Sequence, residues 1–90
     1  MTQTKPLNNA EALSLVKDSV TQIVPDADFT LIRPDDRFRD VLELDSLDFL
    51  SLIELLSEQA GVRIDEEDYP NLTTLADTTR FLVERTRQGS

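Results

Sequence analysis

Apolar side chains recur at helical spacing in three stretches of this 90-residue chain, and this periodicity restricts its fold more than any other feature. The first stretch predicts a helix over about residues 9–24, and the second predicts one over about residues 46–60. The third predicts a last helix that begins near Thr73 or Thr74. Only two glycines occur, which also favours helices over sheets. The expected fold class is an all-α four-helix bundle of three long helices and one short helix, with a long loop between helices one and two.

Local signals mark the ends of these helices. Asn8 or Asn9 is an N-cap candidate for the first helix, and Pro25 stops it. Gly61 is expected to end the second helix as a C′ residue, and Thr74 suits a capping box at the start of the last.

The connections between the long helices differ in length. Residues 25–44 form a long loop, in which a short helical turn is expected around residues 36–41. Large apolar residues argue that this loop is pinned across the core rather than disordered; they are Phe29, Leu31, Ile32, Phe38, Val41 and Leu42. The acidic stretch at residues 65–69 is too short for more than a turn or two of helix, ended by Pro70-Asn71.

Composition limits the kinds of chemistry that this chain can perform. Ninety residues are enough for one domain, expected to span residues 1–90 with an ordered core at about 8–86 and frayed ends at 1–6 and 89–90. No stretch reads as a secretory leader or a membrane span, so a cytoplasmic monomer is expected. Cysteine and histidine are both absent, which excludes disulfides, thiolate nucleophiles, histidine acid–base chemistry and ordinary zinc sites. Any thiol chemistry on this protein therefore needs a bound group.

The formal net charge of −9 is concentrated in the middle of the chain. Residues 35–68 hold twelve acidic side chains against three arginines, whereas the two flanking segments nearly balance. A concentrated negative field repels nucleic acid and anionic lipid, and it steers basic protein partners at low salt. A solvated acidic face that only aids solubility is the ordinary alternative, but the concentration around Ser46 favours partner steering.

The tetrapeptide Asp45-Ser46-Leu47-Asp48 sits where the acidic loop gives way to the second helix. Asp45 is a good N-cap, and Asp48 completes an Asp-x-x-Asp variant of the capping box, so Ser46 is expected at the first helical position with its hydroxyl pointing outward. Unpaired amides and the helix dipole favour an anion there, which suits a phosphate-linked attachment. Seven apolar residues between positions 47 and 56 cover more than one helical stripe, and Leu47 is expected to stay in solvent.

Taken together, these features resemble an acyl carrier protein over about residues 13–83. The matching segments are Phe38 eight residues before Ser46, the motif Asp45-Ser46-Leu47-Asp48, the link Gly61-Val62-Arg63-Ile64-Asp65, and the start of the last helix at Leu72-Thr73-Thr74-Leu75. Some positions depart from the family pattern: Glu43 replaces a usual glycine, Ser51 and Ser57 replace frequent carboxylates, and Asp65 replaces a frequent proline. These departures suggest a specialised stand-alone carrier rather than the general carrier of fatty acid synthesis.

The resemblance implies that Ser46 receives 4′-phosphopantetheine from coenzyme A through a phosphopantetheinyl transferase. Acyl groups would then be carried as thioesters on the terminal thiol of the arm, by a protein that is not itself an enzyme and has no catalytic or metal site. Fatty acyl, polyketide, hydroxyacyl and aminoacyl loads all suit one arm. The implied partners are the transferase and the acyl-loading and acyl-transferring enzymes, which have basic docking surfaces. They would recognise Asp45, Leu47, Asp48, Glu54 and Glu58.

Two other interpretations of Ser46 stay open at this point. A carrier-like domain that is never modified would act as an acidic protein-interaction module. A small hydrolase with Ser46 as its nucleophile would need a base, and the chain has no histidine and no lysine near this serine in sequence. The acidic residues 65–68 lack the spacing of a calcium loop and are interpreted as a solvated turn.

Electrostatics predicts how a phosphate on Ser46 would behave. A phosphate at a helix N-terminus gains about 0.3–1 kcal/mol. A carboxylate about 6 Å away costs roughly 0.7 kcal/mol in water. With Asp45 and Asp48 both nearby, the two effects nearly cancel, which predicts that the phosphate is not docked and that the arm swings freely.

Overall fold

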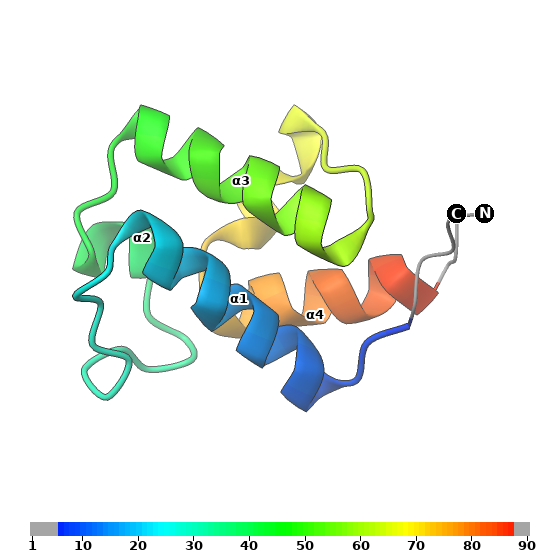
Figure 1. The fold of residues 1–90 in the computed structure, drawn as a ribbon, viewed down its shortest axis with the longest axis horizontal. Helices are drawn as coiled ribbons and strands as arrows, with labels where there is room; N and C mark the ends of the chain where they lie inside the picture. The colour runs from blue at the N-terminus through cyan, green and yellow to red at the C-terminus, as the bar shows by residue number, and fades with distance from the viewer. Residues whose placement is uncertain (1–5, 88–90) are drawn as a thin grey trace.

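The computed structural model describes residues 6–87, and the expected fraying at residues 1–5 and 89–90 lies outside this range. The fold is all-α, with three long helices, one short 3₁₀ helix and a single extra turn, as the sequence predicted. In chain order the elements are α1 (Asn9–Ile23), α2 (Phe38–Val41), α3 (Ser46–Ala60), η1 (Glu66–Leu72) and α4 (Leu75–Arg87). Figure 1 shows α3 along the top of the molecule with α1 and α4 below it, and α1 packs against both α3 and α4. No helix within residues 6–87 is long and apolar enough to cross a membrane.

Helix α1 begins and ends at local signals. The Asn8 carboxamide accepts a hydrogen bond from the Glu11 amide at 2.8 Å, and the Glu11 carboxylate accepts one from the Asn8 amide at 3.1 Å, which completes a capping box. The helix ends at Ile23 rather than at Val24, the end expected from sequence. Proline disfavours helical angles in the residue before it, and Val24 accordingly has φ −126° and ψ 88°.

The other helices also start or end at local sequence signals. Gly61 follows α3 in the left-handed conformation, with φ 68° and ψ 33°, as expected for a C′ glycine. The Thr74 hydroxyl accepts a hydrogen bond from the Asp77 amide at 3.0 Å and so caps α4. The short helix was predicted to end at Pro70-Asn71, but η1 continues to Leu72, whose side chain is fully buried.

The core lies between α1, α3 and α4 and takes three buried apolar side chains from the long loop. Phe38, on α2, is fully buried, and Ile32 is buried as well. The other apolar loop residues are less enclosed than predicted: Phe29 and Leu42 are half-buried, whereas Leu31 is 73% exposed and Val41 is 46% exposed. The loop is therefore fixed to the core by Ile32, Phe38 and Leu44, and Phe29 and Leu42 pack against it.

Candidate functional site

Ser46 is the first residue of α3, and its side chain is exposed, as the sequence predicted. The residue before it, Asp45, has extended backbone angles, and its Oδ1 accepts a hydrogen bond from the Asp48 amide at 2.8 Å. The N-cap prediction is thus confirmed. The second half of the capping box does not form within residues 6–87, since no hydrogen bond joins the Asp45 amide to the Asp48 carboxylate. One side-chain cap is sufficient to start the helix here and to leave the serine hydroxyl facing outward.

Arg39, which the sequence analysis did not assign to the site, lies beside Ser46. Its Nη2 donates a long hydrogen bond of 3.5 Å to Ser46 Oγ, and its Nε donates one of 3.3 Å to the Leu44 carbonyl. The guanidinium carbon also lies 4.9 Å from the centre of the Phe49 ring, a cation–π contact. A basic side chain within a strongly acidic segment was the available signal, but only the turn of α2 brings it to Ser46.

The loop that leads into α3 is shaped by a left-handed residue. Glu43 has φ 55°, at the position where the sequence analysis noted a departure from the usual glycine. The Glu43 amide donates to the Asp40 carbonyl at 3.2 Å, and the Leu44 amide donates to the Arg39 carbonyl at 2.9 Å. This pair of bonds is the Schellman motif, which ends α2 and directs the chain toward Ser46.

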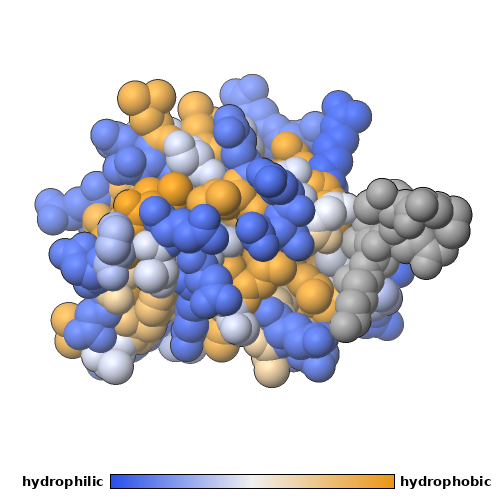
Figure 2. Space-filling model, viewed as in Figure 1, coloured by the Kyte–Doolittle hydropathy of each residue, from blue (hydrophilic) through white to orange (hydrophobic). Residues whose placement is uncertain are grey.

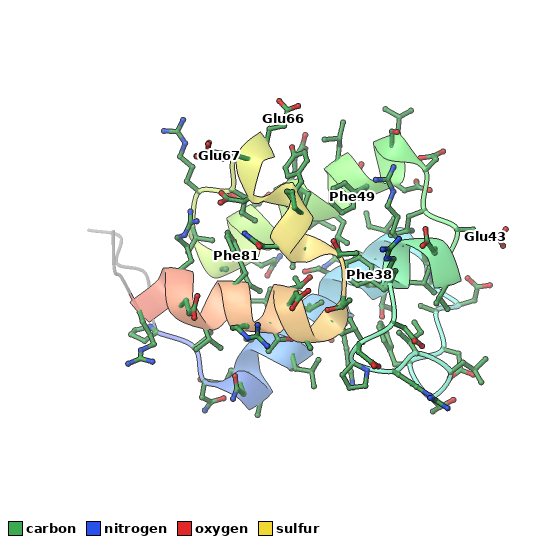
Figure 3. The ribbon with its side chains drawn as sticks, turned by 180° about the vertical axis from the view of Figure 1, so that it is seen from behind. Phe38, Glu43, Phe49, Glu66, Glu67 and Phe81 are labelled. Carbon is green, nitrogen blue, oxygen red and sulfur yellow. The ribbon has the colours of Figure 1, made fainter. Side chains whose placement is uncertain are left out.

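A groove of about 500 Å³ opens next to Ser46 between α2, α3 and η1. Its polar end carries Arg37 and Arg39, and its apolar wall includes Phe49 and Tyr69. These two rings meet edge to face, with centroids 5.5 Å apart. Figure 3 shows Phe49 on the side of α3 that faces η1. Tyr69 is half-buried, packs against the core and forms part of the groove wall.

The outer face of α3 combines apolar and acidic side chains. Leu47 is 73% exposed, as predicted, and Leu50, which the sequence analysis did not single out, is 42% exposed. Glu54 and Glu58 are exposed one turn apart further along the same helix. Figure 2 shows hydrophobic side chains among hydrophilic ones over α3. Of the predicted recognition residues, only Asp48 is half-buried; Asp45 is exposed with the others.

Within the acidic residues 65–68 after α3, Asp65 and Asp68 form contacts inside the fold. The Asp68 carboxylate accepts a hydrogen bond from the Asp65 amide at 3.0 Å. Arg63 pairs with Asp65 at 2.9 Å, and Arg85 pairs with Asp68 at 3.2 Å. Among the residues that the structure describes, no group of three or more acidic side chains is placed to hold a metal ion.

Comparison with known proteins assigns the family. The family model described as the phosphopantetheine attachment site matches residues 14–82. The chain belongs to the acyl carrier protein family. It is 33% identical over 73 residues to the acyl carrier protein of Solidesulfovibrio magneticus, covering 78% of this chain and 94% of that relative. It is 27% identical over 82 residues to the acyl carrier protein of Acidothermus cellulolyticus, covering 89% and 94% of the two chains.

The prosthetic group of this family is covalently bound 4′-phosphopantetheine, and the site has the features that such a group needs. A phosphate-linked arm requires an exposed hydroxyl and surroundings that tolerate an anion. The Ser46 hydroxyl is exposed, and the unpaired amides at the start of α3 favour negative charge. Arg39 adds a full positive charge at the same place.

Proposed function

We propose that this protein carries acyl groups as thioesters on a 4′-phosphopantetheine arm attached to Ser46, and that it presents them to separate biosynthetic enzymes. In this proposal the protein is a cytoplasmic carrier and not itself an enzyme. The observation that carries the proposal is the exposed Ser46 hydroxyl at the capped start of α3, inside the segment that matches the phosphopantetheine attachment site.

Loading is a nucleophilic displacement in which Ser46 supplies the attacking oxygen. An Oγ–P bond forms to the β-phosphorus of coenzyme A, the bridging P–O bond to the adenosine half breaks, and that half leaves. The serine proton needs an acceptor. Arg39 is the side chain that contacts Ser46, and an arginine has no acceptor group, so the base comes from the transferase. Once bound, the arm supplies the thiol that this cysteine-free chain lacks.

The outer face of α3 supports a role in partner recognition. Leu47 and Leu50 offer apolar contacts, and Asp45, Glu54 and Glu58 attract basic surfaces, mainly by raising the association rate. The rate of loading by the transferase at low substrate should therefore fall as salt rises. A loading rate that does not depend on salt would show that these charges do not steer the partner.

Intact-mass measurement after incubation with a transferase and coenzyme A tests the attachment. The wild type should gain the mass of one phosphopantetheine, and Ser46→Ala should gain nothing while keeping its helicity. Ser51→Ala is a matched control, because Ser51 is also an exposed serine on α3, and this variant should load like the wild type. A wild type that stays bare would favour the alternative of an unmodified acidic protein-interaction module. A Ser46→Ala variant that loads would show another attachment site.

A further inference from the structure

The Arg39 side chain is held in a fixed position beside Ser46, and the proposed function gives this position no role. Its guanidinium is constrained by the Leu44 carbonyl and lies over the ring of Phe49. The side chain is half-buried, and α2, which carries it, is anchored in the core by the fully buried Phe38. A long, rotatable side chain is thus placed beside Ser46 before any ligand arrives, so binding an anion there costs little further conformational entropy.

We propose that Arg39 binds the phosphate of the arm on Ser46 and fixes the root of the arm, while the rest of the arm remains mobile. This inference rests on the proposed attachment at Ser46. It assigns a positioning role to an arginine on α2 that precedes the attachment motif by several residues.

The distance between the two side chains fits this role. Arg39 Nη2 lies 3.5 Å from Ser46 Oγ, which is too long for a strong hydrogen bond to the hydroxyl. A phosphate on Oγ projects its oxygens beyond that atom and toward the neighbouring donors. The weak contact to a hydroxyl then becomes a charge-assisted contact to a phosphate oxygen, for which the planar guanidinium is well suited.

Arg39 also changes the electrostatic balance that was worked out from the sequence. That balance set the dipole of α3 against the carboxylates of Asp45 and Asp48, and it predicted a free phosphate. Arg39 adds one full positive charge beside Ser46 and offsets one of the two carboxylates. Compared with the balance of dipole and carboxylates alone, this charge shifts the equilibrium toward a held phosphate.

The groove defines which way the arm leaves. Arg39 and Ser46 line the groove between α3 and η1 together with Phe49 and Tyr69. A phosphate held at Arg39 therefore starts the arm on this side of α3. Beyond the phosphate the arm is uncharged, so Arg39 does not hold its thiol end.

Phosphorus-31 relaxation of the loaded protein tests the proposal. The phosphate in the loaded wild type should relax like the rigid backbone, with an order parameter near about 0.85, and in loaded Arg39→Gln this value should fall below about 0.6. That change corresponds to a drop of at least about 1.4-fold in the order parameter. Arg37→Gln is the matched control, since Arg37 lines the same groove but makes no contact with Ser46 within residues 6–87, and it should behave like the wild type.

Two further measurements on the wild type separate binding from a structural role for Arg39. Loading should shift the side-chain Nε resonance of Arg39, and raising the salt concentration should increase the mobility of the phosphate, since a charge contact is screened. A loaded wild type with a mobile phosphate and an unshifted Arg39 resonance would overturn the proposal, whether or not Arg39→Gln folds. Intact mass measured beforehand keeps the two proposals apart. A protein that does not load refutes the attachment, whereas one that loads with a mobile phosphate refutes only the anchor.

Discussion

Replacing Glu43 by glycine should stabilise the domain. Glu43 is a non-glycine residue with φ 55°, and it occupies the left-handed position of the Schellman motif that ends α2. Its side chain is exposed, and Figure 3 shows it projecting away from the molecule. The strain therefore lies in the backbone, where the Cβ atom crowds the carbonyl oxygen, and is not offset by packing of the side chain.

The expected change in the free energy of unfolding is the difference between two opposing effects. The left-handed conformation costs an L-residue roughly 1–2 kcal/mol, and glycine removes most of that cost. Glycine also makes the unfolded chain more flexible, which costs about 0.4–1 kcal/mol. The net gain should be about 0.5–1 kcal/mol, equivalent to about 3–6 °C in Tm for a domain of this size.

Thermal and urea unfolding of the wild type, Glu43→Gly and Glu43→Ala tests this estimate. Alanine removes the same carboxylate from an acidic segment but keeps the Cβ atom, so the difference between the two variants isolates the backbone term. Glycine should exceed alanine in stability by the predicted amount. If the alanine variant were as stable as the glycine variant, any gain would come from lost charge repulsion and the argument from φ would be refuted.

Four other substitutions test local contacts. Arg85→Ala should lower the free energy of unfolding by about 2 kcal/mol, because it removes two charge-assisted hydrogen bonds, one to the Asp68 carboxylate in η1 and one to the Arg63 carbonyl in the link before it. Arg80→Ala, at an exposed 3.7 Å pair, should cost less than about 0.5 kcal/mol by urea unfolding. Ser19→Ala should raise stability by up to about 1 kcal/mol, since the buried Ser19 hydroxyl has no hydrogen-bond partner among residues 6–87; a loss of stability would contradict this. Hydrogen bonds from the hydroxyl and amide of Thr30 hold the pKa of Asp28 below its ordinary 3.8. The contribution of Asp28 to stability is therefore present above about pH 3.8 and lost as pH falls through the lowered pKa, and an NMR titration should show the midpoint rising in Thr30→Ala.

The parts of the fold that were predicted correctly depend on local signals. The residues that determine where a helix starts or ends lie within a few positions of that point in the sequence. This holds for the starts at Asn8 and Asp45 and for the end at Gly61. The exposure of Leu47 followed from counting apolar residues around one helix, because a helix packed on one side cannot bury all of them. Capping and periodicity need no knowledge of what the chain packs against.

The features that sequence reasoning missed depend on contacts between elements. Arg39 reaches Ser46 only through the turn of α2; the sequence predicted a short helical turn around residues 36–41, but not where its side chains would point. Tyr69 forms part of a groove wall because the fold sets its ring edge to face against Phe49 of α3, a contact that the spacing of apolar residues along one helix does not reveal. The exposure of the Leu31 side chain likewise depends on the path of the long loop, which hydrophobicity alone does not determine.

Peptide mass spectrometry of the loaded protein tests the central claim most directly. After incubation with a transferase and coenzyme A, the protein is digested and the modified peptide is fragmented to locate the added group. The account predicts one phosphopantetheine per chain, attached to Ser46 and to no other residue. A modification on a different side chain, or a protein that stays unmodified beside an active transferase, would contradict it.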